Sequence, residues 1–392
     1  MASLTRITNT PRDYAWGTPG GVARLLGGPV STKPEAELWL GSHPGSPSRS
    51  VAAGGEWSDL AGWEQASGRR LPFLLKVLSA ASPLSLQAHP TPGQAREGFD
   101  REERSGIARD AAERNYRDPF AKPEIIVAAE DGFEALCGFR EPAAVVAELD
   151  ELLAGGAGNE VERWRDLLRG ADPLRHATAW LLSGSPEVDD LIADLTRIAR
   201  SHPDRFELLV RLADAYPGDP GIAVALMTNR LTLRAGEALW LPAGNIHAYL
   251  RGTGIELMGP SDNVLRGGLT PKHIDVAELQ RVVDFSPSAS PSLEPEQVGS
   301  SVVSYRPASH ASGRGAGFQL LVVTGEATLP LASPAIALCV TGSFSLASEG
   351  TSLEVGRGEA VFVDEPGDLA ISGSGQLYLA VGSDELPAPV PA

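Results

Sequence analysis

Two of the seven histidines, His89 and His247, lie in segments whose residue types and spacing could bind a metal ion. His89 ends residues 84–89 (LSLQAH), where apolar and polar residues alternate. If this run is a β-strand, Ser85, Gln87 and His89 share one face, because successive side chains point to opposite sides. We expect this face to line a cavity; a strand face in contact with solvent is the alternative.

Glu124 stands at the entrance of a second apolar run, residues 122–128 (KPEIIVA). A carboxylate that enters a buried strand must be paired with a cation or bound to a metal. Lys122 shares a face with Glu124 by the same alternation. The segment therefore predicts either a metal ligand or an ion pair at the strand entrance.

His247 completes the spacing Gly236-x5-Pro242-x-Gly244-x2-His247. This spacing resembles the second conserved motif of the cupin superfamily, whose β-barrel or jelly-roll fold holds a metal in its interior. Closed antiparallel barrels can leave an interior pocket for a ligand. The resemblance therefore implies a metal ligand at His247.

Further segments, in order along the chain, resemble the motifs of type I mannose-6-phosphate isomerases. They are residues 14–17 (YAWG), 36–44 (AELWLGSHP), 85–90 (SLQAHP), 122–124 (KPE), 242–250 (PAGNIHAYL) and 261–272 (SDNVLRGGLTPK). The last of these is the most specific to the family. The resemblance spans residues 14–280 and is weakest in the helical segment and the C-terminal part, where only the architecture matches.

The resemblance implies one zinc ion per chain, held by Gln87, His89, Glu124 and His247. Nitrogen and carboxylate ligands suit zinc, and this set leaves room for water or substrate oxygens. It also implies interconversion of mannose 6-phosphate and fructose 6-phosphate, in which a proton moves between C2 and C1 through an enediol(ate). Such an enzyme belongs to carbohydrate metabolism, with supply of GDP-mannose and use of mannose as a carbon source both open.

This reaction requires a base for a carbon-bound proton and a positive charge for the enediolate oxygen. We assign the charge to zinc and Arg266, where the family's active-site arginine also falls. For proton transfer, Glu256 and Lys122 are both candidates. Glu256 lies among apolar residues that would raise its pKa, but it could instead pair with a cation. Lys122 could shuttle a proton between substrate oxygens or simply neutralise Glu124.

Four further residues are candidates for binding the substrate. Lys272 and Ser85 are expected at the phosphate, because ammonium and hydroxyl groups are common phosphate partners. Tyr249 and Trp16 are expected to wall the pocket, with a role as core aromatics as the alternative.

The hydrophobic pattern predicts a mainly β chain with a helical insertion: two cupin or jelly-roll β domains plus an α-helical domain. Short apolar runs bounded by turn residues predict strands in residues 1–140 and 222–285, the discontinuous catalytic cupin domain. Apolar residues at helical spacing after Pro142, Pro186 and Pro203 predict the helical domain, residues 141–221. Pro- and Ser-rich residues 286–291 predict a linker, and residues 298–390 a degenerate cupin-like β domain.

Residues 234–241 (RAGEALWL) and 356–363 (GRGEAVFV) share Gly-Glu-Ala before an apolar strand. They predict two related β units, with chance recurrence as the alternative. Leu369 stands where His247 stands, so the second unit lacks this candidate ligand.

The composition argues against several other classes of protein. The net charge of −17 and the lack of a basic cluster argue against binding nucleic acid or an anionic membrane. Cys137 and Cys339 are the only cysteines and lack metal-site spacing, which favours a reducing cytoplasm. No apolar run reaches about 18 residues and the N-terminus lacks an apolar signal segment. We expect a cytoplasmic monomer whose partner is a small sugar phosphate.

Two other cupin functions stay open. An iron-dependent dioxygenase would favour a His-x-His pair or a triad of two histidines and one carboxylate, but Gln87 takes the first position of that pair. A non-catalytic sugar-binding or regulatory cupin would lack metal ligands, as only the C-terminal unit does at Leu369.

Overall fold

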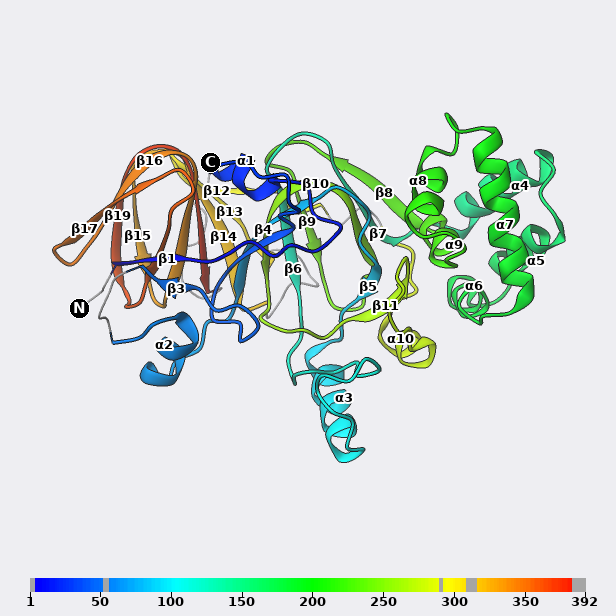
Figure 1. Ribbon diagram of the computed structural model, residues 1–392, viewed down its shortest axis with the longest axis horizontal. Coiled ribbons are helices and arrows are strands. Elements are labelled where there is room, and N and C mark those ends of the chain that lie inside the picture. The colour runs from blue at the N-terminus through cyan, green and yellow to red at the C-terminus, as the bar shows by residue number, and fades with distance from the viewer. Residues whose placement is uncertain (1–3, 52–55, 289–291, 308–315, 383–392) are drawn as a thin grey trace.

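The computed structural model describes residues 4–51, 56–288, 292–307 and 316–382. Strands dominate, in two β-sheets that stand side by side, and a block of helices covers the far end of one sheet (Figure 1). In the described part of the chain, no helix combines the length and the apolar character needed to cross a membrane. The prediction of a mainly β chain with helices is confirmed.

The sheet that carries the candidate ligands has nine strands within the described chain. They are β2 (Glu37–Leu40), β4 (Leu74–Ala80), β5 (Leu86–Ala88), β6 (Glu124–Ala128), β7 (Phe133–Phe139), β8 (Thr228–Leu233), β9 (Ala238–Leu241), β10 (His247–Met258) and β11 (Leu265–Gly268). Every residue of β4, β6 and β7 is buried, which explains their largely apolar sequences.

β10 is the longest strand of this sheet and pairs with four others. Its first part, from His247 to Arg251, lies beside β5 and β7, and its second part lies beside β4 and β6. The change of partners falls at Gly252, where φ is +114° and an added Cβ would lie 2.7 Å from the Phe133 Cα. Only glycine fits there. One strand thereby supplies two buried polar side chains, His247 and Glu256.

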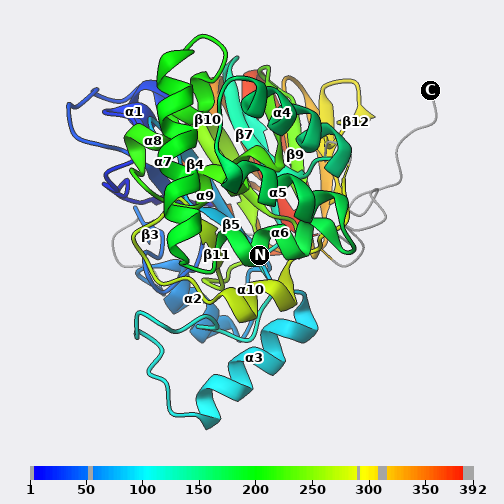
Figure 2. The same ribbon diagram turned by 90° about the vertical axis from the view of Figure 1, so that its right-hand side faces the viewer.

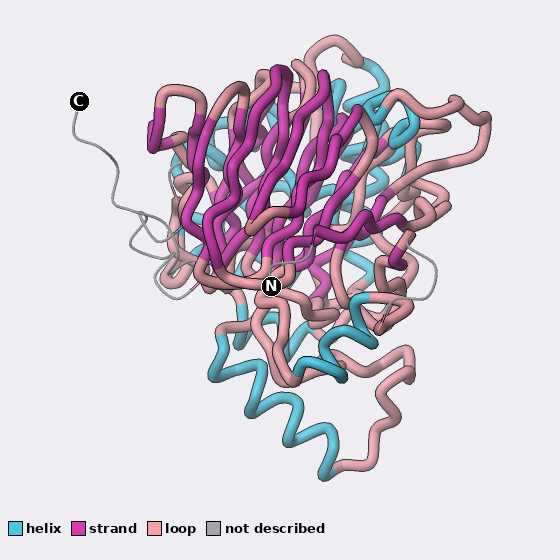
Figure 3. Tube along the Cα trace, turned by 90° about the vertical axis from the view of Figure 1, so that its left-hand side faces the viewer, coloured by secondary structure: helices cyan, strands magenta, loops and turns pink. Residues whose placement is uncertain are grey.

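The other sheet has ten strands among the described residues and faces the viewer in Figure 3. They are β1 (Leu4–Thr8), β3 (Arg49–Ser50), β12 (Glu296–Gly299), β13 (Val302–Tyr305), β14 (Phe318–Val323), β15 (Ala327–Leu331), β16 (Ala335–Ser348), β17 (Thr351–Gly356), β18 (Ala360–Val363) and β19 (Gly367–Gly382). The predicted division put residues 1–140 with the catalytic unit, whereas β1 pairs with β18 in this C-terminal sheet. Local residue patterns carry no signal for such long-range pairing.

The two Gly-Glu-Ala segments adopt the same turn. The φ angle is +85° at Gly236 and +84° at Gly358. In each turn the glutamate side chain accepts a hydrogen bond from the backbone N–H three residues earlier, at 2.8 Å for Glu237 and 2.7 Å for Glu359. This shared geometry favours two related β units over chance recurrence.

The helices of the described chain are α1 (Gly21–Leu26), α2 (Leu60–Ser67), α3 (Pro92–Arg104), α4 (Pro142–Ala154), α5 (Asn159–Arg169), α6 (Pro173–Leu181), α7 (Pro186–Ser201), α8 (Glu207–Ala215), α9 (Gly221–Leu226) and α10 (Val276–Val282). α4 to α9 form the block at the end of the nine-stranded sheet, while α3 projects away from it (Figure 2). α4 and α7 begin at the expected prolines, and α8 begins four residues after Pro203.

The expected return to strands at residue 222 is wrong, because α9 intervenes and β8 begins only at Thr228. All six residues of α9 are buried, so its sequence has no polar face by which to recognise a helix. Of the predicted linker, Ser288 donates its N–H to the Phe139 carbonyl at 3.0 Å, and residues 289–291 lie outside the described chain.

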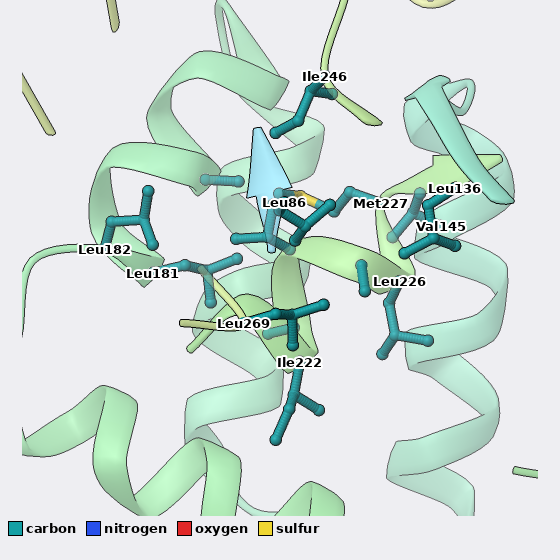
Figure 4. Packing of buried hydrophobic residues seen from close by; sticks show 14 of the residues in the cluster. Leu86, Leu136, Val145, Leu181, Leu182, Ile222, Leu226, Met227, Ile246 and Leu269 are labelled. Atoms are coloured by element: carbon teal, nitrogen blue, oxygen red, sulfur yellow. The ribbon is translucent and has the colours of Figure 1, made fainter. Parts of the chain in front are cut away.

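One apolar core joins the helical block to the nine-stranded sheet (Figure 4). Leu86 of β5 and Leu269, which follows β11, pack in the same cluster as Val145 of α4 and Ile222 of α9. The helices therefore support the end of the sheet that carries the candidate site.

Candidate active site

Three side chains with metal-binding atoms meet inside the nine-stranded sheet. His89 follows β5, Glu124 opens β6 and His247 opens β10. The Glu124 Oε1 atom lies 3.2 Å from His89 Nε2, and Oε2 lies 3.4 Å from His247 Nε2. One ligand atom of each residue lies within 4.8 Å of the others, and all three side chains are 1% exposed. β5 brings its end beside the start of β10, where Gln87 lies opposite His247.

Gln87 lies at the centre of β5, opposite His247 on β10 and Arg266 on β11. Its side chain lines the cavity described below. The strand itself is shorter than residues 84–89, since β5 begins at Leu86 and ends before His89.

Backbone carbonyls orient both imidazole rings. His89 Nδ1 lies 2.8 Å from the Asn263 carbonyl oxygen, and His247 Nδ1 lies 3.0 Å from the Asn245 carbonyl oxygen. A carbonyl oxygen only accepts, so each Nδ1 carries a proton, and Nε2 is the ring nitrogen that faces Glu124. Neither Nε2 atom has a hydrogen-bond partner within the described structure. Burial lowers the pKa of His89 to about 4, which leaves its ring neutral, as a metal ligand requires.

Glu124 is ionised although it is fully buried. Burial alone would raise its pKa, but the Lys122 ammonium holds the pKa of this carboxyl well below its usual range. The Lys122 ammonium lies 2.8 Å from Glu124 Oε1, so the expected ion pair exists alongside the cluster. Two unpartnered imidazole nitrogens, a carboxylate and a nearby amide fit a zinc ion.

A cavity of about 650 Å³ has in its lining Gln87 and Lys122, the latter paired with Glu124 of the cluster. The sequence-predicted residues that line it are Trp16, Gln87, Lys122, Arg266 and Lys272. Its charged lining is mainly basic, with two acidic side chains, Glu37 and Asp262, against six lysines and arginines, Lys76, Arg114, Arg117, Lys122, Arg266 and Lys272. A chain of net charge −17 thus concentrates cations where an anionic substrate would bind.

Three of these cations, Arg117, Arg266 and Lys272, make no ion pair with the described residues. Burial lowers the pKa of Arg266 and of Lys272. The positive charge of Arg117 lowers both pKa values further, and the charge of Arg266 also lowers the pKa of Lys272. Like charges in one cavity repel one another until an anion joins them. The arrangement therefore suits a phosphate group.

A second charged cluster surrounds Lys76, in the middle of β4. Its Nζ atom lies 3.3 Å from Glu37 Oε1 and 3.2 Å from Glu256 Oε2. The Tyr249 hydroxyl donates to Glu256 Oε1 at 3.0 Å. Burial opposes the charge on Lys76, but the surrounding carboxylates, Glu37 first, raise its pKa above the usual value. Glu256 thus makes the pairing with a cation that was the alternative to its role as a base.

Three of the residues predicted for catalysis or substrate binding, Ser85, Glu256 and Tyr249, are not among those that line the cavity. The same holds for three candidate metal ligands, His89, Glu124 and His247. Tyr249 is buried, with its hydroxyl 3.4 Å from Glu124 Oε2 and 3.0 Å from Glu256 Oε1. It joins the two charged clusters instead of walling the pocket.

Sequence reasoning missed Lys76, Glu37 and Arg117. Lys76 interrupts an otherwise apolar run, residues 71–78, and the argument applied to Glu124 could have found it. Glu37 lies in one of the matching segments, but its residue type alone suggested no partner. Arg117 lies in an irregular loop after α3, where no periodicity marks a functional side chain.

Comparisons with known proteins agree over most of the chain. Residues 4–142 match the model of the phosphomannose isomerase type I catalytic domain. The mannose-6-phosphate isomerase of Salmonella typhimurium is 34% identical over 393 residues, covering 95% of this chain and 98% of the relative. That of Homo sapiens is 34% identical over 317 residues, covering 71% and 72%. A crystal structure of a zinc-bound mannose 6-phosphate isomerase matches with a TM-score of 0.85 and 32% identity, covering 97% of this chain and 99% of that one.

Agreement in sequence and in fold over nearly the full length defines this chain as an isomerase. More narrowly, the chain belongs to the type I phosphomannose isomerase family. Membership confirms the resemblance on which the sequence analysis relied, and it favours the isomerase over both other cupin functions.

Proposed function

We propose that this chain interconverts mannose 6-phosphate and fructose 6-phosphate with one zinc ion held by Gln87, His89, Glu124 and His247. The observation that carries the proposal is the pair of buried, unpartnered Nε2 atoms that face Glu124 beside a cavity lined by cations. Zinc bound there would act as a Lewis acid towards the sugar oxygens at C1 and C2.

Phosphate binding is assigned to Arg117, Arg266 and Lys272. Their unpaired positive charges support this assignment, since a phosphate would relieve their mutual repulsion. Arg266 also lies opposite Gln87, so its charge is near the proposed metal site and can stabilise the enediolate oxygen. Ser85 lies outside the cavity lining and is a weaker candidate than Arg117.

Proton transfer between C2 and C1 is assigned to Lys122. Of the two candidates, only Lys122 lines the cavity, and a catalytic acid or base must first be within reach of the substrate. Glu256 is assigned a supporting role, in which it fixes Lys76 and the Tyr249 hydroxyl.

We further propose that both β units are cupin domains and that only the first binds metal. The shared Gly-Glu-Ala turn supports a common origin, and the fully buried Leu369 occupies the position that corresponds to His247. A cytoplasmic location, a monomeric state and a place in GDP-mannose supply remain predictions.

Replacement of Arg266 by alanine tests the active-site assignment. Loss of a preorganised charge that acts on the transition state should lower kcat on mannose 6-phosphate about 100- to 1,000-fold, with zinc content unchanged. Arg163→Ala is the matched control, because Arg163 is an exposed arginine of α5 that pairs with Glu187. Near-normal kcat in the Arg266 variant would refute the assignment.

A further inference from the structure

The turn after β11, residues 268–272, connects Arg266 to Lys272 and is held by a side chain from the helical block. Asp219 lies in the turn between α8 and α9. Its Oδ1 atom accepts hydrogen bonds from the N–H groups of Leu269 at 2.8 Å and of Gly221 at 2.7 Å. Its Oδ2 atom accepts from the Thr270 N–H at 2.9 Å. One carboxylate therefore binds two consecutive amides of the turn and one amide of its own segment.

The backbone of this turn has positive φ angles at two consecutive residues, Gly268 and Leu269. Leu269 has a φ angle of +54°, which residues other than glycine rarely adopt. Gly268 has a φ angle of +120°. Gly268 also touches the backbone of Gly221, since a Cβ added to Gly268 would lie 2.4 Å from the Gly221 Cα. Such a conformation persists only where the surroundings determine it.

Two features hold the turn in this conformation. The Leu269 side chain is fully buried in the core shared with α9, where Figure 4 shows it beside Ile222. The Asp219 carboxylate holds the backbone on the other side through charge-assisted hydrogen bonds, which are about twice as strong as neutral ones.

The turn also separates two cations that repel each other. Arg266 lies two residues before Gly268, and Lys272 lies two residues after Thr270. Both line the cavity, and the charge of Arg266 lowers the pKa of Lys272. In an unrestrained turn this repulsion would move Lys272 away from Arg266.

From these contacts we infer that Asp219 is a positioning residue for the isomerisation: it holds the turn so that Arg266 and Lys272 bind one phosphate group together. This inference rests on the proposed phosphate site. It gives the helical block a part in catalysis, because Asp219 reaches the turn only from the end of α8.

The test compares Asp219→Asn and Asp219→Ala with the wild type in the full-length, zinc-loaded protein. The alanine variant loses all three hydrogen bonds, and KM for mannose 6-phosphate and the dissociation constant for inorganic phosphate should each rise about tenfold. The isosteric asparagine keeps one oxygen for Leu269 and Gly221 but cannot accept from Thr270, so it should give a smaller rise in both constants.

Asp214→Asn is the matched control, because Asp214 is an exposed acid of α8 whose ion pair is with Arg200.

A purely structural role for Asp219 would reduce the fraction of active enzyme and lower the apparent kcat, without changing KM or phosphate affinity. Unchanged KM and phosphate affinity in folded, zinc-loaded Asp219→Ala would overturn the inference; if that variant does not fold, the same result with Asp219→Asn would do so. Failure of the proposed function would be visible separately, as absence of turnover in the wild type, while phosphate binding would still report on Asp219.

Discussion

Replacing Lys76 with methionine removes the charge at the centre of the second cluster and keeps a side chain of similar length. Lys76 is 6% exposed and lies between Glu37 and Glu256, of which Glu256 is 3% exposed. Glu37 lines the cavity, whereas Glu256 does not line it and lies in the buried second half of β10. The variant therefore contains two buried carboxyl groups without a counter-ion.

Breaking a buried ion pair by removing one partner costs about 3–5 kcal/mol. The lower end applies here, about 3 kcal/mol, because each carboxylate keeps another donor. Glu37 retains the Trp39 indole N–H at 2.9 Å, and Glu256 retains the Tyr249 hydroxyl at 3.0 Å. Adding Glu256→Gln removes one of the two unpaired charges and should restore part of the lost stability.

Urea unfolding followed by tryptophan fluorescence measures this loss; the ring of Trp39, one of the seven tryptophans, lies 5.0 Å from Lys76 Nζ. Burial already raises the pKa of Glu256, and without the opposing charge of Lys76 this pKa should rise further, so the folded state binds more protons than the unfolded state. The destabilisation should therefore shrink as the pH falls from about 8 to about 5. A variant as stable as the wild type across this range would refute the account of Lys76 as the counter-ion of a buried cluster.

Three further predictions follow from the same geometry. His247→Ala should lower bound zinc on elemental analysis, because it removes one of the two unpartnered nitrogens; unchanged metal stoichiometry would contradict the ligand set. Arg117→Ala should raise KM for mannose 6-phosphate about tenfold and weaken its dependence on ionic strength, with kcat less affected; an unchanged KM would remove Arg117 from the phosphate site. Since folding lowers the pKa of His89 from 6.5 to about 4, chelated protein should be most stable above pH 6.5 and lose that contribution as the pH falls towards 4. His89→Gln should flatten this part of the pH profile, and an equally steep profile would assign the effect to another group.

Much of the candidate site could be predicted from the sequence because its candidate ligands lie in short motifs. Gln87 and His89 are two residues apart, and the spacing that ends at His247 is itself a recognised motif. Strand alternation correctly indicated that Lys122 and Glu124 lie close together. The family resemblance supplied the proposed role of Arg266, which no spacing would have given.

The remainder depends on contacts between distant segments. Lys76 meets Glu37 and Glu256 only because β2 and β10 flank β4 in the sheet. β1 crosses to the C-terminal sheet, and α9 interrupts the expected strands, for reasons of packing that a local pattern does not contain. The turn held by Asp219 is likewise a product of tertiary structure, since its hydrogen bonds connect residues about 50 positions apart.

The most direct test of the proposed function is the rate of conversion of mannose 6-phosphate by one preparation before chelation, after chelation and after zinc is restored, with bound metal measured at each stage. The account predicts one zinc per chain before chelation, loss of activity in parallel with loss of zinc, and recovery of both when zinc is added. Full activity in protein shown to be free of metal would contradict it.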